Sequence, residues 1–446
     1  MPGRVDVGRV VGAEAGEEVV GPAFTAAEQL RADPEHLLDQ RRAIGVRAEL
    51  DVGPQDVGKL GRAGNDRRRE VDDLHGATIR GRRDYDAPVS KRTLTRLMSS
   101  FLGLGAMLLF AIPDRVLRLV FGHAPVPAEH LRADAWAVGR VVGVLDRGPR
   151  SRGIEQMRLE TDLLSVAVAE PRPRGLEIRD LPLDPHGDGG PIRSRLYRPL
   201  GVPSTGPLLV FFHGGGWAVG SIESHDRPCA LLACEAGVKV LSVQYRLAPE
   251  NPFPAAADDA LRAWKAVTAE PGRFGTEAGR IAVGGDSAGG NLAAVLCQDL
   301  RREGLDQPAL QLLIYPVTEV GSRRQSMEDF ATGYYLTADR MDSFSEFYVE
   351  REQYGNFRAS PLKADDFSGL APAWVITGLA DPLRDEGEEY AEHLAEAGVE
   401  VRSDRFPLIH AWFNMTRSRS ARQAHEVLAD GLAAYMAAPQ PSSSPD

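Results

Sequence analysis

The chain has 446 residues, a hydrophobic share of 43% and a formal net charge of −11. This length allows one large domain with additions, or two or three ordinary domains, each with a sizeable buried core. The acidic balance argues against a protein that binds nucleic acid by neutralising phosphates, so we expect a small-molecule substrate and no nucleic-acid partner.

The first part of the chain lacks the side chains of a folded core, because residues 1–84 contain a single aromatic residue, Phe24. Such a segment cannot bury enough apolar surface to offset its ordering entropy. We therefore expect residues 1–92 to form a disordered or loosely helical extension, or translation to begin near Met98. No signal-peptide pattern opens the chain, and the three cysteines lack CxxC spacing, which indicates a cytoplasmic protein with reduced cysteines and no metal.

Residues 98–112 are the one candidate membrane element. They read MSSFLGLGAMLLFAI and carry no charge. These 15 residues are fewer than the roughly 20 that span a bilayer, so no integral span is expected. We expect an apolar helix that covers a pocket, within a helical cap region at 93–190; the alternative is weak contact with a membrane surface.

From about residue 190, short apolar strands alternate with helices. The sequence predicts strands at 193–199, 208–213, 238–245, 280–285, 310–316, 373–378 and 399–406, and helices at 255–269, 291–303, 384–397 and 421–437. Strands that are apolar nearly throughout indicate a mostly parallel central sheet with helices on both faces. We therefore predict an open α/β domain at 191–437, a flexible tail at 438–446, and functional residues beyond the carboxyl ends of the strands.

The segment GGDSAGG places Ser287 between a strand and a helix, with Gly285 and Gly289 on either side in a GxSxG pattern. A nucleophilic serine on a sharp strand-to-helix turn needs such glycines, because larger side chains would clash there. A glycine-rich turn could also receive a phosphate, but no Lys-Ser or Lys-Thr pair follows.

The segment FFHGGGW, at the end of another predicted strand, supplies unobstructed backbone N–H groups that suit a developing oxyanion. A plain flexible loop is the alternative for this segment taken alone.

A serine nucleophile also needs a base and an orienting acid. Of the ten histidines, His410 stands shortly after the final predicted strand, where it can reach the sheet edge that carries Ser287. Asp381 leaves an earlier strand at that edge, and Asp385 is the second candidate for the acid. Asp286 is expected to point away from the serine and to support the loop. The order Ser287, Asp381, His410 is the one expected for a triad on this open α/β architecture.

Taken together, these motifs resemble the hormone-sensitive lipase-like family of α/β-hydrolases, the bacterial esterases marked by an HGGG loop. Further matching stretches are YRLAPENPFPAAADDA from residue 245, GYYLT from 333, ASPL from 359 and DPLRDEGEEYAEHL from 381. The resemblance covers roughly residues 150–437. One departure is Ala411, where the family usually has glycine; if that position has a positive φ, Ala411 is strained.

The resemblance implies the α/β-hydrolase fold with a helical cap, and a serine carboxylesterase that forms an acyl-enzyme without a cofactor. Ser287 would be the nucleophile, His410 the general acid and base, and Asp381 the orienting carboxylate. The oxyanion hole would consist of the N–H groups of Gly215, Gly216 and Ala288.

The cap would combine the amino-terminal helices with an insert at about 317–370. That insert holds six aromatic residues: Phe330, Tyr334, Tyr335, Phe344, Phe347 and Tyr348. Most are expected to be packing residues; Trp217, Tyr334 and Tyr335 are the candidates for substrate binding.

Short- or medium-chain carboxylic esters are the expected substrates. A lipase or amidase with the same triad is the alternative, as is a non-catalytic protein that binds a small ligand. The chain is expected to be a monomer or a homodimer.

Overall fold

The computed structural model describes residues 104–145, 153–184, 187 and 189–437, and the side chains of these residues except 143–145. The predictions for residues 1–92 and 438–446 lie outside the described residues, as does the first part of the apolar stretch at 98–112.

An eight-stranded sheet forms the centre of the molecule, with strand order β1-β2-β4-β3-β5-β6-β7-β8. Its strands are β1 (Leu176–Leu183), β2 (Ile192–Pro199), β3 (Leu208–Phe212), β4 (Lys239–Gln244), β5 (Ile281–Asp286), β6 (Gln311–Ile314), β7 (Ala373–Ala380) and β8 (Val401–Ile409). β2 is antiparallel to both β1 and β4, and the other neighbours pair in parallel. The prediction of a mostly parallel sheet is therefore confirmed.

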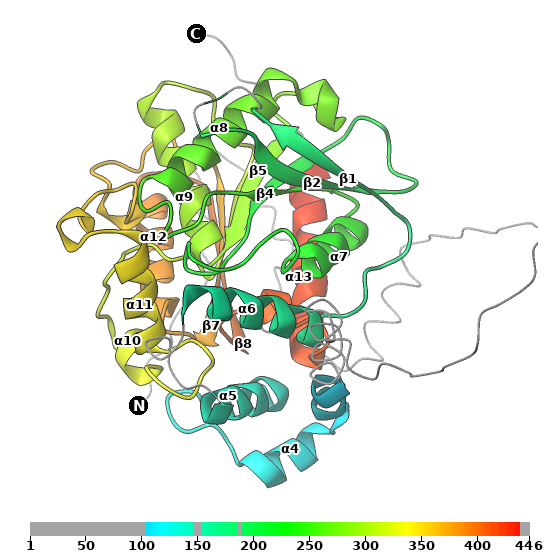
Figure 1. Ribbon diagram of the computed structural model, residues 1–446, viewed down its shortest axis with the longest axis vertical. Helices are drawn as coiled ribbons and strands as arrows, with labels where there is room; N and C mark the ends of the chain where they lie inside the picture. The colour runs from blue at the N-terminus through cyan, green and yellow to red at the C-terminus, as the bar shows by residue number, and fades with distance from the viewer. Residues whose placement is uncertain (1–103, 146–152, 185–186, 188, 438–446) are drawn as a thin grey trace, which may run out of the picture.

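Helices cover both faces of this sheet (Figure 1). One face carries α8 (Ala255–Ala269), α9 (Ala288–Arg302) and α12 (Arg384–Glu396); the other carries α7 (Asp226–Ala236) and α13 (Arg419–Ala437). The lower half of Figure 1 includes α4 (Asp114–Phe121), α5 (Ala133–Leu145), α6 (Ile154–Val168), α10 (Gln325–Asp329) and α11 (Ala338–Tyr348).

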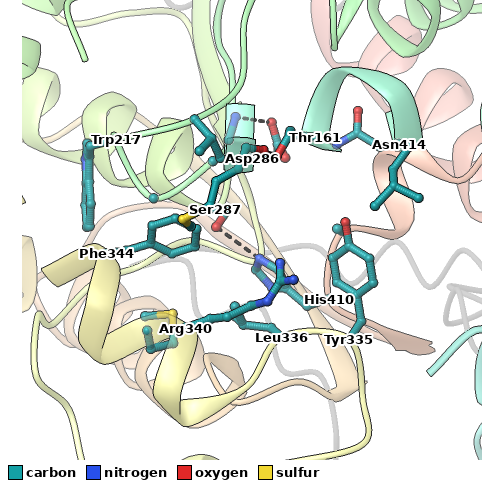
Figure 2. A pocket seen from close by; sticks show the side chains of 18 of the residues that line it. Thr161, Trp217, Asp286, Ser287, Tyr335, Leu336, Arg340, Phe344, His410 and Asn414 are labelled. Carbon is teal, nitrogen blue, oxygen red and sulfur yellow. Dashed lines mark hydrogen bonds between the residues drawn. The ribbon is translucent and has the colours of Figure 1, made fainter. Parts of the chain in front are cut away.

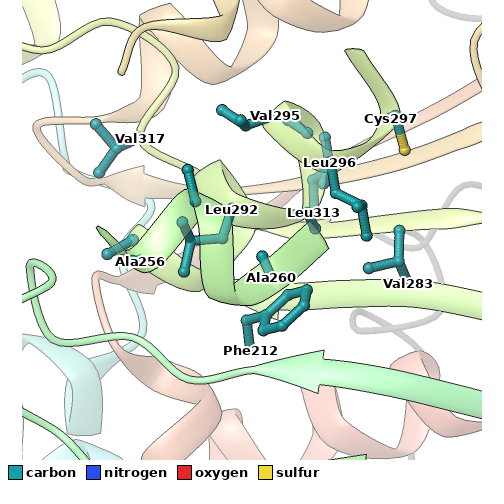
Figure 3. Packing of buried hydrophobic residues seen from close by; sticks show 14 of the residues in the cluster. Phe212, Ala256, Ala260, Val283, Leu292, Val295, Leu296, Cys297, Leu313 and Val317 are labelled. Atoms are coloured by element: carbon teal, nitrogen blue, oxygen red, sulfur yellow. The ribbon is translucent and has the colours of Figure 1, made fainter. Parts of the chain in front are cut away.

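The core has two layers because successive side chains of a strand point to opposite faces of the sheet. In β3, Val210 and Phe212 belong to the cluster shared with α8 and α9, whereas Leu209 and Phe211 belong to the cluster shared with α7 and α13. Figure 3 shows Phe212 of this first layer among the side chains of α8 and α9, including Leu292. This double burial explains why the central strands are apolar throughout.

Strand β1 corrects the predicted boundary of the cap region. Residues 93–190 were expected to be helical, yet β1 within them pairs with β2 over its full length. β1 is an edge strand whose residues are mostly half-buried or exposed. Its sequence LEIRDLPL therefore lacks the continuous apolar run by which the central strands are identified.

The described part of the 98–112 stretch is also placed differently from the expectation. Residues 104–111 are helical, but no residue of this segment lines the cavity at Ser287. Leu104, Met107 and Leu108 are exposed by 53%, 54% and 61%, and only Phe110 is buried. The helix that covers the cavity from the amino-terminal part is α6 instead.

Candidate active site

Ser287 stands on a strained turn between β5 and α9. Its φ of 55° and ψ of −119° are unusual for a residue with a side chain, and such strain is typical of a nucleophile elbow. A Cβ on Gly289 would lie 1.9 Å from the carbonyl oxygen of Phe212, and one on Gly285 would lie 2.5 Å from the same oxygen. Both glycines of the GxSxG pattern are therefore required because the turn presses against the end of β3.

Three side chains from separate loops meet at this turn, and Figure 2 shows two of them, Ser287 and His410. The Nε2 atom of His410 lies 3.0 Å from the Oγ atom of Ser287, and its Nδ1 atom lies 2.7 Å from Oδ2 of Asp381. The other oxygen of Asp381 accepts a hydrogen bond of 2.9 Å from the backbone N–H of Leu383. Since Asp381 is fully buried and accepts only, His410 carries its proton on Nδ1 and presents Nε2 to the serine as an acceptor.

The second candidate for the acid, Asp385, lies elsewhere. It stands in the first turn of α12, where its carboxylate accepts the backbone N–H of Ser326 and pairs with Arg384. The structure thus brings Asp381, and not Asp385, to His410.

The glycine loop that follows β3, residues 213–216, is called the oxyanion loop below, and it is closely packed against its neighbours. A Cβ on Gly215 would lie 2.2 Å from the carbonyl oxygen of Val219, and one on Gly216 would lie 2.3 Å from the Phe344 ring. Both glycines line the same cavity as Ser287. Within the described part of the chain, the N–H groups of Gly215, Gly216 and Ala288 donate to no protein acceptor. These groups are therefore available to a bound oxyanion.

Asp286 supports the glycine loop, as its sequence position predicted. Its Oδ1 atom accepts a hydrogen bond of 2.8 Å from the N–H of Gly214 and lies 3.1 Å from Nε2 of His225. Its Oδ2 atom accepts a bond of 3.3 Å from the hydroxyl of Tyr315. Burial raises the pKa of this carboxyl, but His225 and the Gly214 N–H outweigh burial and hold the pKa below the usual value.

Two other histidines are fully buried and unsuited to act as bases. Burial, together with the neighbouring His225, lowers the pKa of His213 to about 3. Burial lowers the pKa of His425 to about 4. Both side chains are neutral at pH 7, and their ring nitrogens bond to the Gly214 and Phe413 carbonyls in the surrounding structure.

A cavity of about 120 Å³ opens above Ser287, between the glycine loop, α6 and α11. Its walls are largely apolar, and Figure 2 shows Phe344 and Leu336 among them with Thr161, Arg340 and Asn414. The sequence did not point to the α6 residues Met157, Thr161 and Leu164, because their spacing along the helix is also that of ordinary core packing.

The three candidates for substrate binding have different surroundings. Trp217 and Tyr335 line the cavity, although the Trp217 ring also stacks on Tyr348 at a centroid distance of 4.1 Å. Tyr334 does not line the cavity: its ring packs against Trp136 and Phe330 at 5.5 and 5.1 Å. Adjacent residues of an irregular loop often point in opposite directions, so the GYYLT stretch could not show which tyrosine faces the site.

A family model described as the α/β-hydrolase fold matches residues 209–414. The chain is 43% identical over 265 residues to the carboxylic ester hydrolase LipN of Mycobacterium tuberculosis, across 56% of this chain and 69% of that protein. The chain belongs to the hormone-sensitive lipase-like family of α/β-hydrolases. It is also 36% identical to the carboxylesterase NlhH of the same organism, across 63% of this chain and 86% of that protein.

Solved structures of this family have the same architecture. The hyperthermophilic esterase of the archaeon Pyrobaculum calidifontis superimposes with a TM-score of 0.63 at 38% identity, over 67% of this chain and 96% of that one. The departure at Ala411 is also clear: its φ of 63° and ψ of 19° lie in the left-handed region that favours glycine. The expected strain next to His410 is therefore present.

Proposed function

We propose that Ser287, His410 and Asp381 are the catalytic triad with which this ester hydrolase cleaves short- to medium-chain carboxylic esters. The observation that carries the proposal is the continuous contact from Ser287 through His410 to buried Asp381, at 3.0 and 2.7 Å. The names of its relatives, among them an ethyl acetate hydrolase of Pseudomonas putida at 44% identity, support the substrate class.

In the proposed mechanism, Ser287 attacks the ester carbonyl carbon as His410 takes the hydroxyl proton. The carbonyl oxygen becomes an oxyanion that accepts hydrogen bonds from the N–H groups of Gly215, Gly216 and Ala288. The tetrahedral intermediate then collapses, and His410 donates its proton to the departing alcohol. Water adds to the acyl-enzyme in the same way, which releases the carboxylic acid and restores the Ser287 hydroxyl.

The size and lining of the cavity support short or medium acyl chains. The cavity measures about 120 Å³, and the Phe344 ring lies directly against the oxyanion loop at Gly216. A lipase or amidase would use the same three side chains. A non-catalytic ligand-binding protein would not require a serine in a strained conformation within reach of a base.

The test is hydrolysis of p-nitrophenyl esters of increasing acyl length by the wild type and Ser287→Ala. We expect activity to peak at short to medium chains and to be lost in the variant. Wild-type protein that is inactive at every length, or a fully active Ser287→Ala, would show the assignment to be wrong. A p-nitroanilide series distinguishes the amidase, and emulsified long-chain triglyceride distinguishes the lipase.

We also propose a weak contact with a lipid surface through residues 104–126. Seven of the ten large hydrophobic residues that are exposed in the described part of the chain fall within this segment. They include Leu104, Met107 and Leu108 on one helix, and Leu119 and Val120 on α4. The i, i+3, i+4 spacing of the first three gathers them on one helix face. None of the helices in the described residues is long and apolar enough to cross a bilayer.

A further inference from the structure

The carboxylate of Asp286 lies at a junction that the proposed triad does not use. Three segments meet there: the oxyanion loop after β3, the turn that carries Ser287, and the short helix Trp412–Asn414 that follows His410. Asp286 is 2% exposed. Burying a carboxylate costs free energy unless hydrogen bonds and charges pair its oxygens. The partners of the Asp286 oxygens therefore indicate what this carboxylate does next to the nucleophile.

The contact with the oxyanion loop is direct. The N–H of Gly214 donates to Oδ1 of Asp286 at 2.8 Å. Gly214 immediately precedes Gly215 and Gly216, whose N–H groups are two of the proposed oxyanion donors. A Cβ on Gly214 would lie 2.5 Å from Oδ2 and 2.9 Å from the backbone oxygen of Asp286. The loop is thus pressed against the residue that precedes Ser287, and one charge-assisted hydrogen bond fixes the distance between them.

A second connection runs through Tyr315 to the segment that carries the base. The Tyr315 hydroxyl donates to Asp286 at 3.3 Å and accepts from the backbone N–H of Phe413 at 3.3 Å. The ring of Tyr315 lies 4.6 Å from the ring of His410. Tyr315 itself has a φ of 37°, an outlier for a bulky residue, and such strain persists only where the surroundings enforce it.

A third connection runs through His225. Its Nε2 atom lies 3.1 Å from Oδ1 of Asp286, and since the carboxylate only accepts, Nε2 carries a proton. The side chain of Asn414 lies 3.1 Å from the same nitrogen. Its Oδ1 atom is buried without a partner in the described residues, so turning the amide over would let this oxygen accept from His225.

We propose that Asp286 is a positioning residue that holds the oxyanion donors at the correct distance from Ser287 and His410. His225 and Tyr315 connect its carboxylate to the segment that carries His410. This inference rests on the proposed esterase function. In this role Asp286 acts through the loop, because its carboxylate sets where the N–H groups of Gly215 and Gly216 point. Such donors stabilise charge that exists only in the transition state, so their misplacement lowers kcat and leaves KM largely unchanged.

The test compares Asp286→Asn and Tyr315→Phe with the wild type in p-nitrophenyl butyrate hydrolysis. Loss of a complete oxyanion donor costs about 10²–10³-fold in kcat, so a misplaced pair in Asp286→Asn is expected to cost roughly 10–100-fold. Tyr315→Phe removes one hydroxyl and keeps the ring, which is expected to cost about 3- to 10-fold. KM should stay within about threefold of the wild type in both variants.

An alkyl boronic acid provides a second readout, because it adds to the serine and places an oxygen where the oxyanion forms. Its affinity should fall in parallel with kcat. Tyr390→Phe is the matched control, since Tyr390 is equally buried on α12 and its hydroxyl faces Cys297 and Gln298 of α9 and not the residues around Asp286. This control should retain wild-type kcat and boronate affinity.

Wild-type kcat and boronate affinity in Asp286→Asn would overturn the proposal, as would a rise in KM at constant kcat. If Asp286→Asn does not fold, Tyr315→Phe decides by the same criteria. Ser287→Ala in the same series separates the two proposals. An inactive Ser287→Ala beside a fully active Asp286→Asn would refute only the positioning role, whereas an active Ser287→Ala would refute the esterase assignment.

Discussion

Replacing Asp381 by Asn tests the orientation of the catalytic histidine. Oδ1 of Asp381 accepts the Leu383 N–H at 2.9 Å, and Oδ2 faces Nδ1 of His410 at 2.7 Å. In Asp381→Asn, the amide oxygen keeps the Leu383 bond and the NH₂ group turns to His410. Nδ1 must then accept, so the imidazole proton moves to Nε2 and faces Ser287. In this tautomer His410 cannot take the serine proton.

The opposite amide orientation, with the oxygen facing His410, is disfavoured. It would place the NH₂ group against the Leu383 N–H, leaving a buried donor unpaired at a cost of about 1–3 kcal/mol. We therefore expect kcat to fall by about 10⁴-fold, the loss typical of an Asp-to-Asn change in such a triad. The Asp and Asn side chains have nearly equal volume, so the melting temperature of Asp381→Asn should stay close to that of the wild type.

The assay is p-nitrophenyl butyrate hydrolysis with the melting temperature measured in parallel. Asp385→Asn is the matched control, because Asp385 stands four residues later and contacts Ser326 and Arg384 instead of His410. It should retain most of the wild-type kcat. If Asp381→Asn kept more than about a tenth of the wild-type kcat, or if both variants were equally impaired while folded, the tautomer argument would be refuted.

Three further predictions concern stability and surface contact. Ala411→Gly should raise the melting temperature by about 1–2 °C, because relief of the left-handed strain slightly exceeds the entropy of glycine in the unfolded chain; a lower melting temperature would contradict this. Burial raises the pKa of Glu386 from 4.5 to about 8, so its stabilising contribution is present below pH 4.5 and is lost as the pH rises to 8. The melting temperature of the wild type minus that of Glu386→Gln should therefore fall from pH 5 to pH 8.5, and a constant difference would exclude this effect. Finally, Leu119→Asp should reduce co-sedimentation with vesicles of anionic phospholipid, whereas Leu305→Asp, at an exposed leucine outside residues 104–126, should not; equal binding by both variants would argue against the lipid contact.

The sequence by itself predicted the central strands and helices in their chain order, and it indicated Ser287 and His410, with Asp381 ahead of Asp385 as the orienting acid. Central strands are buried on both faces, so their apolar runs are visible without any knowledge of their neighbours. Ser287 could be identified because a strained turn tolerates only small residues around it, which leaves a local pattern. The strain at Ala411 was suggested only by the resemblance to a family that usually has glycine there, and the φ of 63° in the structure shows that the position is left-handed.

Tertiary structure decided whatever depends on segments that are distant in the chain. β1 has the mixed pattern of an edge strand, so only its pairing with β2 assigns it to the sheet. Asp381 and Asp385 are chemically equivalent in sequence, and only the path of the chain after β7 brings the first to His410. Asp286 contacts Tyr315 and His225, which are 29 and 61 positions away in the chain. No local sequence pattern predicts contacts at such separations. The lining of the cavity by α6 follows from how that helix packs over the sheet, because a residue that faces a cavity and one that faces a core have the same helical spacing.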